Sequence, residues 1–264
     1  MVSDDVRSTR ADYGLDAPPV VRNLLIAGVI GLAMWGGTAL GLWPGSFRIP
    51  LGADELQVVF AGAGLSIGLT CFALAAWMIW WSKVGKVRGR ERLLDTHRWT
   101  GREQVLDVGC GRGLLLIGAA KRLTTGRATG IDLWRSEDLA GNEAVAVWAN
   151  AAAEGVSDRV AVETADMRKL PFEAARFDLV LSQFAIHNVP AASGRREAVE
   201  EIVRVLKPGG EVIISDIRHL KAYAEILRAR GLAVSLEGST VTRLVLGLVT
   251  FGSLRPGVVR GLRP

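Results

Sequence analysis

Two long apolar stretches without a charged residue mark the N-terminal third of the chain. The first covers residues 24–43 and the second covers residues 56–81, with a short polar link between them. A helix of about 20 apolar residues is long enough to cross a hydrocarbon core about 30 Å thick. The pattern therefore predicts a transmembrane helical hairpin over residues 23–82. Glycines in both stretches are small enough to let the two helices pack closely.

After residue 103 the pattern changes to short apolar runs of strand length. Runs that predict buried strands occupy residues 105–108, 128–133, 160–163, 177–182 and 211–216. Stretches that predict helices lie between them, at about 115–122, 138–154 and 194–206. Alternation of strands and helices builds a parallel sheet covered on both faces. The pattern therefore predicts a Rossmann-like α/β domain over residues 104–264.

The first strand of this domain runs into a glycine-rich turn that opens a helix. Gly109, Gly111 and Gly113 alternate as G-x-G-x-G, one residue tighter than the G-x-G-x-x-G of dinucleotide-binding turns. Bulky side chains here would keep a ligand away from the backbone, and a positive φ favours glycine. Asp107, at the strand end, would repel a pyrophosphate but suits a ligand that carries an amino group. The turn therefore predicts a nucleoside cofactor.

Further motifs follow the glycine turn in a defined order. Asp132 ends the second strand, where a Rossmann-like domain binds ribose hydroxyls. The later motifs are the segments 165–167 with 170–172, 177–180 and 206–210. In this order, over roughly residues 90–237, they resemble the motifs of class I S-adenosylmethionine-dependent methyltransferases. The segments 170–172 and 184–189 look most like the quinone and sterol methyltransferase branch.

The resemblance implies a seven-stranded methyltransferase sheet that ends in two antiparallel strands, at 232–237 and near 258–260. It implies S-adenosyl-L-methionine as the cofactor and S-adenosyl-L-homocysteine as the product. Asp107 and the three glycines would hold the methionine portion. Asp132 would bind the ribose diol, and Leu133 would pack on the adenine.

The remaining cofactor contacts implied by the resemblance come from later strand ends. Asp166 would accept a hydrogen bond from the adenine amino group beside Met167, and Ser182 and Gln183 would lie near the sulfonium. Simpler alternatives stay open, because an aspartate at a strand end is usually a turn or cap residue. Asp107 could instead tie down the turn backbone, and the two apolar residues, Leu133 and Met167, could be packing.

The segment after the fourth strand contains the two catalytic candidates, His187 and Asn188. In the resembling family this segment borders the acceptor pocket, and a histidine titrates near neutral pH, which suits a general base. The alternative is that His187 caps or packs the following turn. Methyl transfer depends mainly on alignment, so a catalytic triad is not required. No cysteine–histidine group has zinc-ligand spacing, so we expect no metal site.

The charges predict how the hairpin is oriented. The segments 83–92 and 7–22 are rich in lysine and arginine, whereas the link at 44–55 holds a single arginine. The positive-inside rule therefore predicts that both termini and the catalytic domain are cytoplasmic. Residues 83–103 are interpreted as a basic juxtamembrane linker and lead-in helix on anionic headgroups, and residues 1–22 as a loosely ordered tail. The neighbouring bilayer explains the net charge of +5 without a nucleic-acid partner.

These features together predict a membrane-anchored methyltransferase that acts on a hydrophobic small molecule, such as a quinone precursor or a lipid. A thiol- or xenobiotic-methylating enzyme and a non-catalytic membrane-bound sensor of S-adenosylmethionine or scaffold remain alternatives. The apolar segment 241–251 fits an edge strand or buried connector, or a flap that lines a lipid-accessible pocket. The oligomeric state stays open and includes a homodimer formed through the transmembrane helices.

Overall fold

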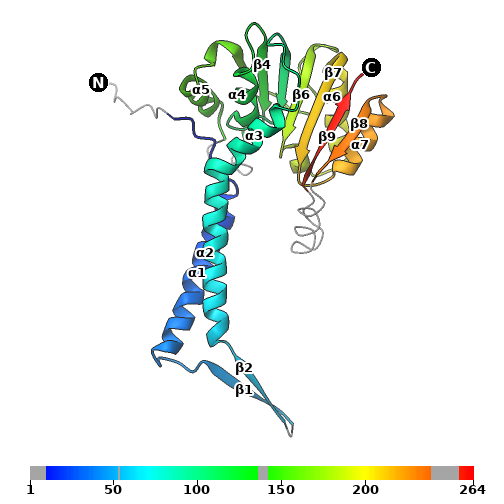
Figure 1. The fold of residues 1–264 in the computed structure, drawn as a ribbon. Coiled ribbons are helices and arrows are strands. Elements are labelled where there is room, and N and C mark those ends of the chain that lie inside the picture. Colours follow the sequence, from blue (N-terminus) through cyan, green and yellow to red (C-terminus); the bar gives the residue numbers. More distant parts are fainter. Residues whose placement is uncertain (1–9, 53, 136–141, 239–255) are drawn as a thin grey trace, which may run out of the picture. The chain divides into compact units, whose positions relative to one another are not determined.

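The computed structural model describes residues 10–52, 54–135, 142–238 and 256–264 (Figure 1). The chain divides into two compact units. One, the hairpin unit, comprises Gly14–Lys86, and the other, the sheet domain, comprises Met1–Tyr13 with Val87–Pro264. The predicted apolar segment 241–251 and part of the predicted helix at 138–154 lie outside the described residues.

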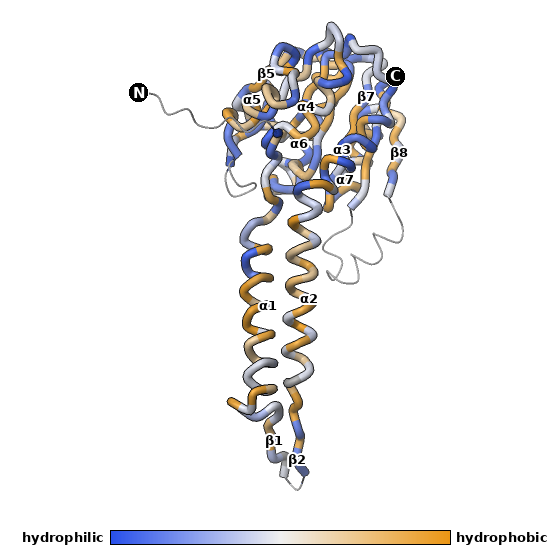
Figure 2. The backbone as a smooth tube through the Cα atoms, turned by 60° about the vertical axis from the view of Figure 1, so that its left-hand side comes forward, coloured by the Kyte–Doolittle hydropathy of each residue, from blue (hydrophilic) through white to orange (hydrophobic). Residues whose placement is uncertain are grey.

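The hairpin unit is built from two long helices joined by a two-stranded ribbon. Its elements are α1 (Pro18–Ala39), β1 (Ser46–Leu51), β2 (Asp54–Val59), α2 (Ala61–Trp80) and a π-helical turn (Trp81–Gly85). Apolar residues predominate along both helices (Figure 2). The helices meet at glycines, since a Cβ on Gly31 would lie 2.8 Å from the backbone oxygen of Gly64. Close helix packing at small residues is therefore as predicted.

The predicted bounds of the two apolar helices need correction. Helix α1 begins at Pro18 rather than at residue 24, because proline is well suited to the first helical turn. It ends at Ala39, before Gly41 with its positive φ of 71°. Residues 56–59 are not part of the second helix as predicted, because residues 54–59 pair antiparallel with residues 46–51 and form the ribbon.

The sheet domain contains a seven-stranded mixed sheet in the order β5-β4-β3-β6-β7-β9-β8. Its strands are β3 (Gln104–Val108), β4 (Arg127–Asp132), β5 (Val160–Thr164), β6 (Phe177–Gln183), β7 (Leu206–Asp216), β8 (Ala233–Glu237) and β9 (Gly257–Leu262). Strands β3 to β7 are parallel, and β9 is antiparallel to both β7 and β8. The predicted Rossmann-like, seven-stranded fold is confirmed.

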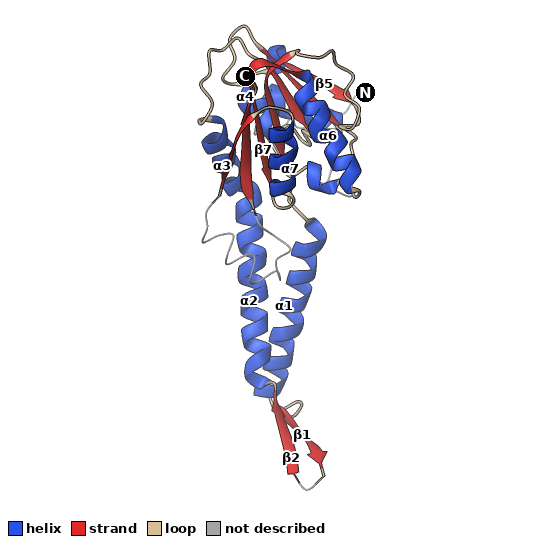
Figure 3. Ribbon diagram, turned by 90° about the vertical axis from the view of Figure 1, so that its right-hand side faces the viewer, coloured by secondary structure: helices blue, strands red, loops and turns tan. Residues whose placement is uncertain are grey.

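Helices cover both faces of this sheet (Figure 3). One core cluster contains side chains of α3 (Lys86–Leu94), α4 (Leu114–Ala120) and α5 (Ala144–Ala153). The other contains side chains of α6 (Ala192–Val205) and α7 (Leu220–Ala229). Alternate residues of β3 enter the two clusters, with Leu106 in one and Val105 in the other. This alternation is what a strand with two buried faces produces.

The strand order reverses between β3 and β6. From β3 the chain builds outward to β4 and β5 on one side, and β6 and β7 lie on the other side. In open α/β sheets, ligands bind outside the carboxyl ends of the strands at such a switch point. The fold therefore places the expected site at the edge where β3, β4, β6 and β7 end.

Candidate active site

The glycine turn after β3 adopts a backbone that requires glycine. Gly109, Gly111 and Gly113 have φ values of +74°, +52° and +84°, all in the left-handed region. A Cβ on Gly109 would lie 2.3 Å from the Cβ of Ala185, which belongs to the loop after β6. The backbone N–H of Gly109 donates to Ile131 on β4 at 2.9 Å. The turn is thus packed between β4 and the β6 loop.

Asp107 is buried at the end of β3 and joins the turn to α4. Asp107 is only 2% exposed, and its Oδ2 accepts a 2.9 Å hydrogen bond from the backbone N–H of Leu116. Burial raises the pKa of Asp107 to about 7, and the nearby Asp132 carboxylate raises it further. The structure therefore shows Asp107 bound to the first turn of α4, and its contact with a cofactor remains a prediction.

Asp132 connects the end of β4 with the glycine turn. Its Oδ2 accepts a hydrogen bond from Gly111 N at 2.9 Å, and its Oδ1 accepts from Trp134 N at 2.7 Å and from Asn142 Nδ2 at 3.2 Å. Leu133, next to it, is 42% exposed. The Oδ1 atom of Asn142 is buried and has no hydrogen-bond partner among the described residues. This corner offers acceptor oxygens that a ribose diol can use.

Asp166 and Met167 follow β5 and reach the same turn. The Met167 Cε lies 3.6 Å from where a Cβ on Gly109 would be. Asp166 is held by Arg168, whose Nε lies 3.0 Å from both carboxylate oxygens. This pairing lowers the pKa of Asp166. Arg168 was missed by the sequence analysis, and an adenine amino group would have to share the Asp166 carboxylate with it.

The residues at the end of β6 divide into structural and accessible ones. Ser182 is 1% exposed, and its hydroxyl donates to the Val108 carbonyl at 2.9 Å, so it ties β6 to β3. Gln183 is half-buried at the last position of β6. Phe184 has a φ of +52°, which is strained for a residue with a side chain. The predicted proximity of Ser182 and Gln183 to the sulfonium remains a prediction.

His187 lies in a 3₁₀ turn, Ile186–Asn188, directly after this loop. Its Nδ1 is 2.6 Å from Oδ1 of Asp216, the last residue of β7 and itself 1% exposed. The two atoms are at ion-pair distance, although their directions do not meet hydrogen-bond geometry. Asn188 is exposed. The structure thus gives one catalytic candidate a buried acidic partner that the sequence analysis did not predict.

Residues 10–13, predicted to belong to a loosely ordered tail, pack on the sheet domain. Asn150 on α5 accepts from Asp12 N at 2.8 Å and donates to the Asp12 carbonyl at 2.9 Å. Arg112 of the glycine turn donates through Nε to the same carbonyl at 2.9 Å. These contacts join residues about a hundred or more positions apart, so no local pattern could have indicated them.

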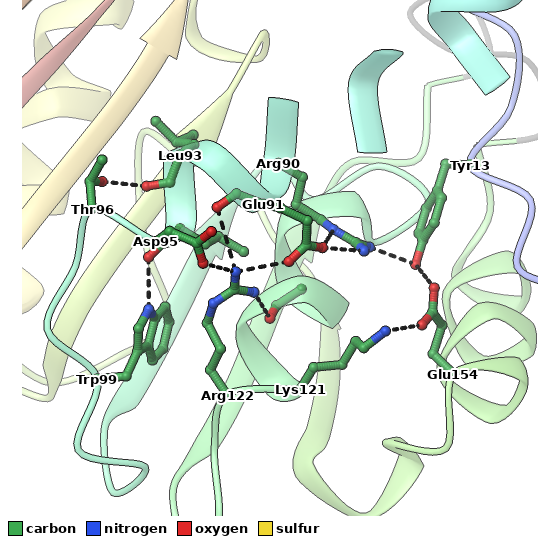
Figure 4. A network of polar contacts seen from close by, with 12 residues as sticks. Tyr13, Arg90, Glu91, Leu93, Asp95, Thr96, Trp99, Lys121, Arg122 and Glu154 are labelled. Atoms are coloured by element: carbon green, nitrogen blue, oxygen red, sulfur yellow. Dashed lines mark hydrogen bonds and ion pairs between the residues drawn. The ribbon is translucent and has the colours of Figure 1, made fainter. Parts of the chain in front are cut away.

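Tyr13 extends this contact into a network of charged side chains (Figure 4). Its hydroxyl lies 3.2 Å from Oε1 of Glu154 and accepts from Nη1 of Arg90 at 3.1 Å. Glu154 also pairs with Lys121 at 2.5 Å. Burial raises the pKa of the Tyr13 phenol well above its ordinary value, so the hydroxyl stays a donor. The prediction that this part of the tail is loosely ordered is therefore wrong.

The arrangement fits S-adenosylmethionine. Glycines without side chains allow a close approach to the backbone, and three carboxylates, those of Asp107, Asp132 and Asp166, lie at the carboxyl edge of neighbouring parallel strands. Carboxylates suit an ammonium group, a ribose diol and an adenine amino group. Residues 105–210 match the family model described as a methyltransferase domain.

The chain contains an S-adenosylmethionine-dependent methyltransferase domain. Over 118 residues, the sequence is 35% identical to the sterol 4-C-methyltransferase of Caenorhabditis elegans, covering 45% of this chain and 32% of that protein. It is 30% identical over 131 residues to the ubiquinone/menaquinone biosynthesis C-methyltransferase of Roseobacter denitrificans, covering 50% of this chain and 49% of that protein.

The methyltransferase domain is also similar to solved structures. A phosphoethanolamine N-methyltransferase of Haemonchus contortus in complex with S-adenosyl-L-methionine aligns with a TM-score of 0.52 and 19% identity. The alignment covers 67% of this chain and 52% of that one. At this identity the likeness concerns the fold alone. The chain spans between about a third and about half of the length of the curated relatives it matches first.

Proposed function

We propose that the protein is a membrane-anchored methyltransferase that transfers a methyl group to a hydrophobic acceptor in the bilayer. The observation that carries the proposal is the exposed apolar hairpin in the same chain as a methyltransferase domain. Two described helical segments, Pro18–Ala39 and Gly62–Leu94, are long and apolar enough to span a membrane. Only 22% and 17% of their most apolar windows are buried.

Low burial distinguishes these helices from the core helices of a water-soluble protein. Val29, Ile67, Leu69 and Trp77 are all more than half exposed. Continuous exposed apolar surface of this kind is stable in hydrocarbon and unfavourable in water. The ribbon between the helices pairs its single arginine, Arg48, with Glu55. Residues 83–92 hold more basic than acidic residues, and this excess supports a cytoplasmic methyltransferase domain by the positive-inside rule.

The acceptor is inferred from the anchor and from the relatives. Tethering raises the effective concentration of an enzyme only toward a substrate that shares its compartment, here the bilayer. The two relatives described above are named for sterol and quinone methylation. Both names describe products of low polarity. A quinone precursor or a lipid-like molecule is therefore the acceptor class that best explains why an apolar hairpin and a methyltransferase domain occur in one chain.

The chain's own residues have positioning roles in this reaction. The cofactor supplies a methyl group already activated on a sulfonium, so alignment and exclusion of water are the protein's main contributions. The glycine turn and Asp132 bind the nucleoside at the β3 and β4 ends, while the loop after β6 faces the acceptor side of the switch point. His187 is the side chain there that is able to take a proton.

The first test follows the methyl group. The full-length protein in detergent, incubated with methyl-labelled S-adenosylmethionine and membranes of the source cell, is expected to place label in the organic-solvent phase. Asp132→Ala removes the acceptor for Gly111 N and the diol, and should weaken S-adenosylhomocysteine binding at least tenfold and reduce labelling with it. The control, Asp158→Ala, alters an exposed carboxylate and should label like the wild type. Labelling confined to protein or to water would contradict the proposal.

The second test concerns the anchor. Lysine in place of Leu69, a 57% exposed position in α2, should oppose insertion by about 2.5–3.5 kcal/mol. We expect Leu69→Lys, combined with Ile30→Lys in α1, to lower the fraction of protein that resists alkaline extraction from membranes. Leu262→Lys changes an equally exposed leucine in the sheet domain and should have no effect. Equal extraction of all three proteins would argue against a membrane-spanning hairpin.

A further inference from the structure

The buried end of β7 holds the carboxylate of Asp216, which contacts His187 after β6 and Tyr223 on α7. Asp216 Oδ1 accepts a 2.7 Å hydrogen bond from Ile217 N and lies 2.6 Å from His187 Nδ1. Asp216 Oδ2 accepts from His187 N at 3.2 Å and from the Tyr223 hydroxyl at 3.4 Å. The backbone and the ring of His187 are therefore both held by one carboxylate.

Burial makes this arrangement rigid. Asp216 is 1% exposed and Tyr223 is 0% exposed, so neither side chain can exchange its partner for water. Burial also raises the pKa of the Tyr223 phenol well above its ordinary value, so that this hydroxyl remains a donor to Asp216. A buried carboxylate is stable only when its oxygens are paired, and His187 is the nearest group able to carry the positive charge.

The second ring nitrogen of His187, Nε2, lies on the side of the imidazole away from Nδ1. Of the two ring nitrogens, only Nδ1 is among the fully buried side-chain atoms without a hydrogen bond in the described part of the chain. Nε2 is not among these atoms, and His187 as a whole is only partly buried. The loop that carries His187 packs against the cofactor turn, since Ala185 stands 2.3 Å from where a Cβ of Gly109 would be.

We propose that His187 is a general base positioned by Asp216, and that the acceptor therefore carries an ionisable proton, as the hydroxyl of a phenol or hydroquinone does. A proton kept on Nδ1 beside Asp216 leaves the lone pair of Nε2 for the acceptor, and Asp216 stabilises the imidazolium that forms. Asp216 is a positioning residue. This inference rests on the proposed methyl transfer and adds the acceptor class.

In the transfer, the acceptor loses one proton and gains one methyl group. The acceptor's proton passes to Nε2 of His187 as the acceptor oxygen forms its bond to the methyl carbon. The carbon–sulfur bond breaks, and its electron pair stays on sulfur as S-adenosylhomocysteine forms. His187 then releases the proton to water. An acceptor that is already ionised needs no base, which provides the discriminating experiment.

The first readout is independent of turnover. The chain has three histidines, so protein labelled with ¹⁵N in histidine gives three pairs of imidazole nitrogen signals by nuclear magnetic resonance. We expect His187→Gln to identify its signal, and we expect that signal to report a proton on Nδ1. Asp216→Asn should shift the proton toward Nε2, the form that a free histidine side chain favours. A wild-type His187 with its proton on Nε2 would overturn the proposal.

The second readout uses phenols of graded acidity as acceptors. With a phenol that is protonated at the assay pH, His187→Gln should lower kcat by about 10²- to 10⁴-fold, with S-adenosylhomocysteine affinity unchanged within twofold. Asp216→Asn should lower kcat less. With a phenol already ionised at that pH, the loss in both variants should shrink to a few fold. Asp158→Ala, at an exposed carboxylate away from this cluster, is the control and should behave as the wild type.

The outcomes separate this inference from the proposed function. Equal losses for ionised and protonated phenols would give His187 a purely structural role and overturn the base assignment while methyl transfer stands. Transfer by the wild type to membrane lipid but to no phenol would overturn the acceptor class alone. Transfer to nothing at all would overturn the proposed function, and the imidazole signals would still decide whether Asp216 holds the Nδ1 proton.

Discussion

The stability of the protein, relative to that of an Asp107→Asn variant, is expected to fall by about 3 kcal/mol between pH 4 and pH 7. The pKa of Asp107 is about 7 in the folded protein, against an ordinary value of 3.8. Between these values the folded protein keeps the proton and the unfolded chain loses it, so a rise in pH favours unfolding. Each pKa unit corresponds to about 1.4 kcal/mol. The stabilisation is complete below pH 3.8 and is lost as the pH rises through 7.

Asparagine is the matched replacement because it is neutral and similar in shape, and its amide oxygen can accept from Leu116 N as Asp107 Oδ2 does. The measurement is thermal unfolding of both proteins in detergent, without cofactor, at intervals of half a pH unit. Asp166→Asn is the control, because the pKa of Asp166 is lowered whereas that of Asp107 is raised. Arg168 lowers the pKa of Asp166, so its stabilisation is lost only below pH 3.8 and adds no slope from pH 4 to 7. Parallel curves for the wild type and Asp107→Asn would refute the prediction.

Replacing Gly109 with alanine is expected to remove measurable cofactor binding and to destabilise the protein by about 2–5 kcal/mol. An alanine at φ +74° costs about 1–2 kcal/mol in backbone strain. Its Cβ would also lie 2.3 Å from that of Ala185, and overpacking of this kind costs about 1–3 kcal/mol. The turn must then move, and the hydrogen bonds from Gly109 N to Ile131 and from Gly111 N to Asp132 are disturbed with it.

Two further variants separate strain from crowding. Gly155→Ala places alanine at a similar φ of +69° with open space around it, so it should show the strain alone. Gly109→Ala combined with Ala185→Gly removes the methyl group that the new Cβ would meet, and should recover the crowding component. Unfolding in denaturant and calorimetric binding of S-adenosylhomocysteine measure both effects. If Gly109→Ala costs no more than Gly155→Ala, crowding against the β6 loop is not the cause.

Local patterns in the sequence predicted most of the sheet domain. The five parallel strands were expected within a few residues of their observed bounds, because a buried strand needs a continuous apolar run. Strand β7 is longer than expected, since it begins at Leu206, which pairs with Phe177 of β6, instead of after the helix stop at 206–210. The two-stranded ribbon of residues 46–51 and 54–59 was not predicted, because the alternation that defines a short exposed ribbon is weak.

Within the candidate site, the sequence predicted positions better than partners. The glycines of the turn were recognised because positive φ and close approach act on one residue at a time. The partners of the acids were not recognised. Asp132 accepts from Gly111, 21 residues away, and Asp216 accepts from His187 N, 29 residues away. Such contacts depend on which strands become neighbours, and the local periodicity of the sequence does not predict the order of the strands.

The sequence by itself determined the strands, the glycine turn, the two apolar helices and the residues that resemble a cofactor site, because each depends on side chains close together in the chain. Only the tertiary structure decided that Asp107 is buried enough to hold its proton near neutral pH. It also decided that Asp12 packs on Asn150, 138 residues away, and that Asp216 lies under His187. Desolvation and pairing are properties of the whole fold, because they depend on which distant segments exclude water from the same place.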